Sequence, residues 1–485
     1  MRRPPNRPPT RLRDRLRAGL GARLRSGWRA VRARGHSEAR SPDRSGSGSG
    51  SGAWASRGRG VLVWGALGLA AFTAALAVLA AALVLLPAPS WTAWQLGLLV
   101  LEFSLLLAVP CALGAALAWG VRRRARRTAL ALLAVNALAI PAAALPPAAG
   151  WWAAREAGVP VSLGDYLTGG LAVSADREPE TVRYAAPEGE ELYLDVWQPA
   201  DHDERAAPLP VVLNIHGGAE DEPQSLLPRW DAWLADQGYL VLDVDYRFFP
   251  PGRWWVPAAD VRCAVDWART NAERWGGDPE RIALMGQSAG GLIALQSAYV
   301  DGELPESGCP GGATEGDGSE DSGSGGDGSG GDGSGGDGSG GDGSGGDGAP
   351  AVDAVIAWYA VTDLTSDAPP FPWRLRHSPI GDELAASNEE MLGGTEDEVP
   401  QAYRDASPLR QVRPGLPPTL LIQGGWDMLN SPADNRRFAA ELDRAGVPHQ
   451  LVETPAAEHM FDLNWGGFGS QLARAEIIRF LADQL

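Results

Sequence analysis

The feature that most constrains this chain is a series of three long apolar stretches within residues 61–150. Val61–Leu86 carries no charged side chain, and its 26 residues at about 1.5 Å rise each exceed the roughly 30 Å of bilayer hydrocarbon. We therefore predict three transmembrane helices, at about 61–86, 91–119 and 128–149. Glu102 lies inside the second, where an ionisable group is costly, and we favour helix packing or snorkelling over a relay role for it.

Arginine placement orients these helices. The chain has no lysine, which excludes lysine Schiff-base chemistry, and residues 1–60 hold 16 arginines against three acids. The loop Val121–Arg127 holds five more arginines. Cytoplasmic flanks carry the excess of basic residues, so we expect a multi-pass protein of the cell membrane with a cytoplasmic N-terminus and everything after Gly150 on the outer face.

Residues 1–60 are rich in Arg, Pro, Gly and Ser and bury little apolar surface. This composition predicts a disordered, Arg-rich cytoplasmic arm. Interleaved aromatic residues are few, so an arm near anionic lipid is favoured over a tail that binds nucleic acid. We expect the lipid bilayer as a partner, and no nucleic acid.

Residues 180–485 alternate short apolar runs with helical patterns. Continuous runs such as Val211–Ile215 and Ile282–Met285 are typical of strands buried on both faces. The alternation predicts an α/β domain with a doubly wound, mostly parallel sheet, joined to the membrane helices by a linker over 151–179. The other predicted strands are Thr181–Tyr184, Leu192–Trp197, Leu240–Val244, Val352–Tyr359, Thr419–Gln423 and Gln450–Glu453. The predicted helices are Trp230–Gln237, Ala259–Arg274, Ala289–Val300 and Gln471–Leu485.

Two segments interrupt this alternation. Residues 302–349 repeat Asp-Gly-Ser-Gly-Gly without the apolar residue that each turn of a calcium β-roll needs, so a disordered acidic insert is predicted. Residues 364–400 are rich in Pro and are predicted to form an irregular lid. The cysteines Cys111, Cys263 and Cys309 lack metal-site spacing, and a disulfide between the last two is a hypothesis because both are predicted to face outward.

A candidate nucleophile lies at a predicted turn from strand to helix. Gly286-Gln287-Ser288-Ala289-Gly290 matches G-x-S-x-G and follows the predicted strand Ile282–Met285 directly. Glycines at these positions allow the tight, strained turn that exposes a serine hydroxyl, and the following helix N-terminus stabilises developing negative charge. We therefore predict Ser288 as the nucleophile.

A serine nucleophile needs a base, and the base needs an orienting carboxylate. Of the six histidines, His459 follows the last predicted strand and is the natural base. Asp427 follows the strand Thr419–Gln423 and gives the chain order Ser, Asp, His that this architecture uses. The rival acids are Asp434, which helix capping explains, and Asp462, which directly follows the histidine loop.

The segment His216-Gly217-Gly218-Ala219 directly follows the strand Val211–Ile215. Backbone N–H groups in such a turn can face a developing oxyanion without side-chain interference. We predict an oxyanion hole from Gly217, Gly218 and Ala289, with a merely structural Gly-Gly turn as the alternative. Trp254 and Trp255 fit an acyl-pocket gate and a core or membrane-facing surface equally well.

Residues from about 180 to 485 resemble an α/β-hydrolase of the esterase/lipase type, close to the hormone-sensitive-lipase-like carboxylesterases. The resemblance rests on His216-Gly217-Gly218-Ala219, Asp245-Tyr246-Arg247, Gly277–Ile282, Gly286–Gly291, Asp427 and His459. It implies two-step ester hydrolysis through an acyl-enzyme, without a metal or a cofactor. Ala219 stands where the lipase-like pattern often has a third glycine, as in feruloyl-esterase-like and formamidase-like relatives, so the acyl preference stays open.

The predicted function is therefore that of a membrane-anchored serine hydrolase that cleaves small-molecule or lipid carboxylic esters at the outer face. An amidase or peptidase on the same scaffold is one alternative, because the same triad cleaves both bond types. A catalytically inactive binding module is another. The oligomeric state stays open.

Overall fold

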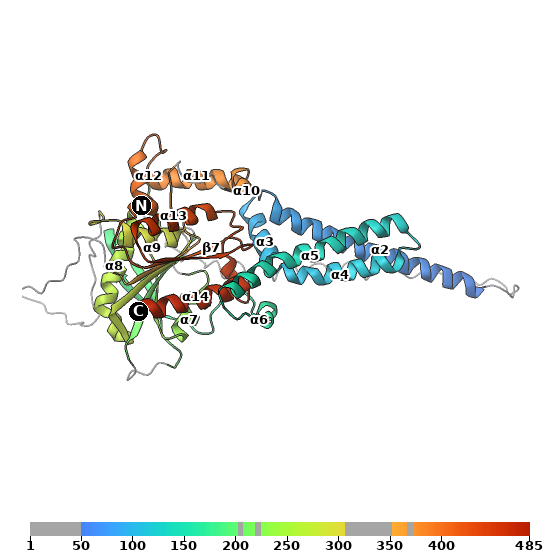
Figure 1. Ribbon diagram of the computed structural model, residues 1–485, viewed down its shortest axis with the longest axis horizontal. Helices are drawn as coiled ribbons and strands as arrows, with labels where there is room; N and C mark the ends of the chain where they lie inside the picture. The colour runs from blue at the N-terminus through green and yellow to red at the C-terminus, as the bar shows by residue number, and fades with distance from the viewer. Residues whose placement is uncertain (1–49, 202–206, 219–224, 306–351, 366–371) are drawn as a thin grey trace, which may run out of the picture. The chain divides into compact units, whose positions relative to one another are not determined.

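The computed structural model describes residues 50–201, 207–218, 225–305, 352–365 and 372–485 (Figure 1). Residues Val61–Leu485 form one compact unit, which contains the apolar helices and the sheet domain. Most of the predicted arm, nearly all of the acidic insert, Ala219 and Cys309 lie outside the described residues.

Eight strands form one sheet in the order β1-β2-β4-β3-β5-β6-β7-β8. β2 is antiparallel to β1 and β4, and the other neighbouring strands are parallel. The strands are β1 Glu180–Ala185, β2 Leu192–Trp197, β3 Leu209–Ile215, β4 Leu240–Val244, β5 Gly277–Gln287, β6 Ala354–Trp358, β7 Thr419–Gly424 and β8 His449–Thr454. This mostly parallel sheet confirms the predicted α/β class.

Helices cover both faces of the sheet, which makes the domain doubly wound (Figure 1). One face packs against α8 (Val256–Asn271), α9 (Ala289–Tyr299) and α13 (Pro432–Ala445). The other packs against α7 (Pro228–Asp236) and α14 (Phe468–Gln484). Burial on both sides explains why the central strands are continuous apolar runs. The carboxyl ends of the parallel strands meet at one edge, where ligands bind in open α/β sheets.

The segment predicted as an irregular lid is largely helical, so that prediction was wrong. It contains α10 (Trp373–Arg376) and α11 (Pro379–Leu392), and α12 (Pro400–Ala406) follows. Ser378 caps α11 by accepting a hydrogen bond from Ile380 N, and Gly393 ends it in the left-handed region at φ 87°. These are ordinary start and stop signals of a helix that outweigh the high proline content.

Three segments of the apolar region are long and apolar enough to cross a membrane: Gly60–Leu85, Ser104–Val121 and Arg126–Glu156. They belong to α2 (Gly50–Leu85), α4 (Ser104–Val121) and α5 (Arg126–Glu156). The three helices pack together, with Asn136 Nδ2 of α5 donating to Ala70 O of α2 at 3.0 Å. Only 17–33% of their most apolar windows is buried, so most of this apolar surface faces outward.

The region before the sheet departs from expectation in three places. The predicted span over 91–119 is two helices, α3 (Trp91–Glu102) and α4, that meet at Phe103. The Tyr166 hydroxyl interrupts the helical ladder there, because it donates to Glu102 O at 2.9 Å and accepts from Leu105 N at 3.4 Å. Helix α2 begins at Gly50, inside the arm predicted to be disordered, because an established helix extends at low cost.

The third departure is the predicted linker over 151–179. It carries the end of α5 and the short helix α6 (Leu163–Thr168). Ala154, Val159 and Ala172 are buried in the core beneath the sheet. This segment is therefore packed into the domain and does not behave as a spacer.

Candidate active site

Ser288 stands at the sharp turn between β5 and α9. Its backbone lies at φ 55° and ψ −116°, a costly conformation for a residue with a side chain. A Cβ on Gly286 would lie 2.2 Å from Gly290 O, and one on Gly290 would lie 2.0 Å from Ile215 O. The two glycines are therefore required for the turn that places the serine beyond the end of its strand.

The structure brings the three predicted side chains together. His459 Nε2 lies 3.0 Å from Ser288 Oγ, and His459 Nδ1 lies 2.9 Å from Asp427 Oδ2. Because an ionised carboxylate only accepts hydrogen bonds, Nδ1 carries the proton and Nε2 is free to accept one from the serine. His459 and Asp427 are both buried.

The loop after β7 fixes the Asp427 carboxylate. Its Oδ1 accepts hydrogen bonds from Leu429 N and Asn430 N, both at 2.8 Å, and its Oδ2 accepts one from Gln423 Nε2 at 3.0 Å. The rival acids have other roles: Tyr359 donates to Asp462 Oδ1 at 2.8 Å, and Asp434 lies in the first turn of α13.

The predicted oxyanion turn lies against the nucleophile. A Cβ on Gly217 would lie 3.0 Å from Ser288 Cβ, and Gly218 has φ 112°. Ala289 is the first residue of α9, so its N–H has no acceptor within the helix. His216 Nδ1 lies 3.0 Å from Gly217 O, which braces the turn. Burial lowers the pKa of His216 to about 4, so the imidazole is neutral at pH 7.

A buried ion pair that the sequence analysis did not find joins the two loops of the site. Glu458 Oε1 accepts hydrogen bonds from Met428 N at 2.5 Å and from His459 N at 3.2 Å. Its Oε2 lies 2.9 Å from Arg374 Nη1, and both side chains are at most 6% exposed. Burial raises the pKa of Glu458, and the Arg374 guanidinium opposes that shift. One carboxylate thus holds the candidate acid loop and the candidate base loop together.

Helix α3, expected inside the membrane, packs on the candidate base. The Trp94 and His459 ring centroids are 6.3 Å apart. Trp94 and Leu98 share an apolar cluster with Met428 and Leu429, the residues that follow Asp427. Glu102 Oε1 accepts a hydrogen bond from Glu458 N at 3.1 Å. No motif pointed to these contacts, because an apolar helix pattern does not distinguish lipid from protein neighbours.

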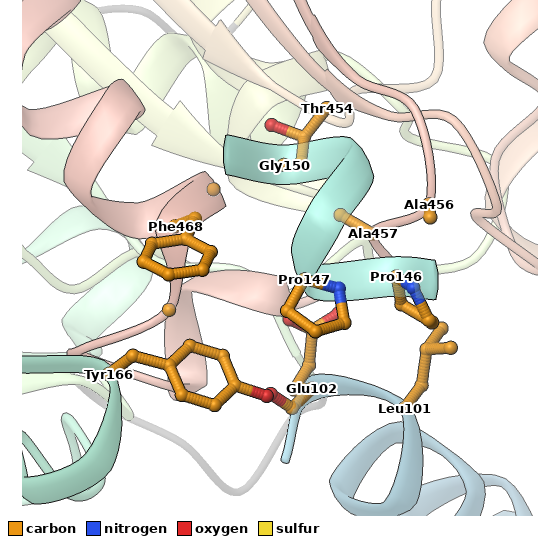
Figure 2. Close-up of a pocket in the computed structure, with 12 residues that line it drawn as sticks. Leu101, Glu102, Pro146, Pro147, Gly150, Tyr166, Thr454, Ala456, Ala457 and Phe468 are labelled. Carbon is orange, nitrogen blue, oxygen red and sulfur yellow. The ribbon is translucent and has the colours of Figure 1, made fainter. Parts of the chain in front are cut away.

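Figure 2 shows a small cavity lined by residues of α3, α5, the segment after β8 and the start of α14. Its volume is about 20 Å³, enough for one water molecule. Glu102, Tyr166, Pro147, Gly150, Thr454 and Phe468 are among its lining residues. Glu102 lies before the candidate span Ser104–Val121, and burial raises its pKa to about 8. Neither Ser288 nor His459 is among the residues that line this cavity.

The remaining predicted residues have structural partners. Arg247 Nη2 pairs with the buried Asp260 Oδ1 at 2.7 Å. Trp254 shares an apolar cluster with Met391 and Leu392 of α11, so it packs against that helix. Within the described residues, no group of three or more His, Cys, Asp or Glu side chains is arranged to hold a metal ion.

Comparison with known proteins identifies relatives of this chain. The model of the BD-FAE family matches residues 194–442, a range that contains Ser288 and Asp427 and ends before His459. Esterase LipC of Mycobacterium tuberculosis is 30% identical over 278 residues, covering 56% of this chain and 57% of that protein. Esterase LipQ of the same organism is 26% identical over 300 residues, covering 58% and 59%. The chain thus spans less than two thirds of the length of these relatives.

Among solved structures, the propionate-bound form of the thermophilic esterase Est2 of Thermogutta terrifontis is similar at 22% identity, with a TM-score of 0.43. The match covers 63% of this chain and 94% of that one.

Proposed function

The chain belongs to the BD-FAE family, and from that membership we propose that it hydrolyses carboxylic esters through Ser288, His459 and Asp427. The observation that carries the proposal is the hydrogen-bonded line from Asp427 through His459 to Ser288 at the turn after β5. Relatives named as esterases support the ester as the bond that is cleaved.

The reaction proceeds in two steps. His459 Nε2 accepts the Ser288 proton while Oγ attacks the ester carbonyl carbon, and the carbonyl oxygen becomes an oxyanion held by backbone N–H groups of Gly217, Gly218 and Ala289. The tetrahedral intermediate collapses when the C–O bond to the alcohol breaks and His459 returns the proton to the leaving oxygen. An acyl-enzyme on Ser288 remains, and water activated by the same imidazole releases the acid.

We propose further that α2, α4 and α5 anchor the enzyme in the membrane, with a cytoplasmic N-terminus and the hydrolase domain outside. Support comes from their mostly outward-facing apolar surface and from the arginines of Val121–Arg127 at the end of α4 that lies away from α3. Cys263 is disulfide-bonded, as expected in an oxidising compartment. Protease added to intact cells should degrade the hydrolase domain and leave an N-terminal tag, and the reverse pattern contradicts this orientation.

The enzymatic proposal is tested with p-nitrophenyl esters from acetate to palmitate and the full chain in detergent. Ser288→Ala should abolish turnover, and Asp427→Asn should reduce kcat by about 10⁴-fold, because the amide favours the wrong imidazole tautomer. Ester turnover that survives Ser288→Ala would refute the proposed nucleophile. If the wild-type protein cleaves no ester, labelling of Ser288 by a fluorophosphonate separates an amidase from an inactive module.

A further inference from the structure

Helix α3 contacts both loops that present the candidate base and acid. Trp94 is 4% exposed and belongs to a cluster with Met428 and Leu429, which follow Asp427. Met460, the residue after His459, packs against the same cluster. The helix therefore covers one side of the reacting groups with apolar side chains.

The chemistry identifies that side. In the proposed reaction the carbonyl oxygen of the ester faces Gly217, in the turn after β3, and Ala289, at the start of α9. The leaving alcohol takes its proton from His459 Nε2. The contacts of α3 with the hydrolase domain include the loops after β7 and β8 and the helices α10 and α11. Helix α3 thus lies on the side of the site formed by the candidate base and acid loops.

The α3 helix is fixed at both ends. Near its start, Trp91 Nε1 donates to Glu383 Oε2 of α11 at 2.7 Å, and the Ser378 hydroxyl donates to Ala88 O. At its end, Glu102 Oε1 accepts from Glu458 N at 3.1 Å. These contacts anchor both ends of α3 beside the site.

Trp94 carries a polar group that no described residue contacts by a hydrogen bond. Its indole Nε1 is buried and has no hydrogen-bond partner among the described residues. Several buried indole N–H groups lack a hydrogen-bond partner among the described residues. The Trp94 ring is the one of these whose centroid lies 6.3 Å from that of His459. A buried donor without an acceptor is unfavourable, and an acceptor oxygen on a bound substrate would relieve that cost.

We propose that Trp94 is a specificity-determining residue on the alcohol side of the site. It selects esters whose alcohol part is apolar and carries an acceptor oxygen a few atoms from the ester bond, as the alcohol part of a glycerolipid does. The apolar neighbours Leu98, Met428 and Leu429 bind the hydrocarbon, and the Trp94 indole N–H donates to the oxygen. Because α3 connects two candidate membrane helices, such a substrate would approach from the lipid surface. This assignment rests on the proposed ester hydrolysis.

The test uses two acetates of equal chain length, heptyl acetate and 2-butoxyethyl acetate, which differ by one CH₂ replaced by oxygen. We expect the wild-type full chain in detergent to favour the butoxyethyl ester in kcat/KM by roughly three- to tenfold, the usual effect of one hydrogen bond. Trp94→Phe keeps an aromatic ring and removes the donor, so it should abolish the preference. Trp119→Phe, the same change at an exposed site in α4, should leave it intact.

A second series, methyl esters of acids from acetate to octanoate, varies the acyl chain alone. Its chain-length profile should keep its shape in Trp94→Phe and in Trp94→Ala. A wild-type ratio near one, a preference retained in Trp94→Phe, or a changed acyl profile would each overturn the assignment while ester hydrolysis stands. Absence of ester turnover by the wild-type protein overturns the proposed function and this assignment together.

Discussion

Replacing Glu458 tests whether the buried ion pair organises the site. In Glu458→Ala the Arg374 guanidinium loses its counter-charge in a site where its side chain is 6% exposed, and breaking a buried pair in this way costs about 3–5 kcal/mol. Met428 N and His459 N lose their acceptor as well. We therefore expect the free energy of unfolding to fall by at least about 3 kcal/mol.

Glu458→Ala should also lower activity, because it removes a contact that positions His459. His459 N donates to Glu458 Oε1 at 3.2 Å, and a shift of about 1 Å at reacting groups can cost about 10²-fold in rate. We expect kcat to fall by about 10²-fold in Glu458→Ala, with KM nearly unchanged and the shape of the pH profile retained. Glu458→Gln, which keeps an acceptor oxygen, should recover part of kcat. A merely structural role would lower the amount of folded enzyme without changing kcat per folded molecule.

A double-mutant cycle separates the charge from the packing. In Glu458→Met combined with Arg374→Met no uncompensated charge remains, so the double variant should be more stable than the sum of the single losses predicts. Glu441→Ala, which breaks a solvent-screened pair with Arg444, should change stability far less than Glu458→Ala does. Chemical unfolding in detergent and ester hydrolysis provide both readouts. Additive losses in the cycle, or a Glu458→Ala protein as stable as the wild type, would refute the reasoning.

Three further outcomes are expected. Gly217→Ala should lower kcat by about 10²-fold, because its Cβ would lie 2.5 Å from Gln287 O and displace the oxyanion turn. Gly120→Ala, where a Cβ meets open space, is the control. Equal kcat values for the two variants would contradict this prediction. Because the pKa of His216 falls to about 4 on folding, the unfolded chain binds this proton more readily, and acidification from pH 6.5 to 4 should cost up to about 3 kcal/mol. His216→Phe should not show this loss of stability on acidification, and thermal unfolding between pH 6.5 and 4 measures the difference. If wild type and His216→Phe lose stability equally over this range, the assignment to His216 is wrong. Removal of residues 1–150 should impair both stability and ester hydrolysis.

The α/β class and the candidate residues Ser288, Asp427 and His459 could be predicted from the sequence because their signals are local. Each of these residues lies within a few positions of the end of a parallel strand whose apolar run is visible, and the carboxyl ends of these strands lie at a common edge. The glycines around Ser288 are a local signal of the same kind, because a turn this tight excludes a Cβ at their positions. That the three residues perform catalysis stays a prediction.

The residues that support the site could not be predicted from the sequence, because their contacts join positions far apart in the chain. Arg374 and Glu458 are 84 positions apart, and each alone resembles an ordinary charged residue. The break at Phe103 depends on the hydroxyl of Tyr166, which comes from a segment predicted to be a linker. Helix α11 was predictable, because Ser378 and Gly393 are clear caps, but its proline-rich surroundings obscured them.

The fragment 151–485 distinguishes an anchor from a structural part of the enzyme. Removing α3 exposes the partners of Trp94 and Leu98, and each such side chain contributes about 1.5–3 kcal/mol by its burial. Removing α5 up to Gly150 also exposes the face of α14 at Phe468, where a Cβ on the glycine would lie 3.3 Å away. The fragment should therefore bind a hydrophobic dye, unfold at a lower temperature and lose most of its kcat/KM.

A second truncated chain separates the effect of removing α3 from the effect of removing the candidate membrane helices. Residues 87–102 joined by a flexible Gly-Ser linker to residue 151 restore Trp94 and the contact of Glu102 with Glu458 N without any candidate span. If α3 is part of the site, this chain should recover ester hydrolysis above the level of the fragment 151–485. If α2, α4 and α5 only anchor a self-sufficient domain, the fragment 151–485 should hydrolyse short esters as fast as the full chain, and the role assigned to α3 would be refuted.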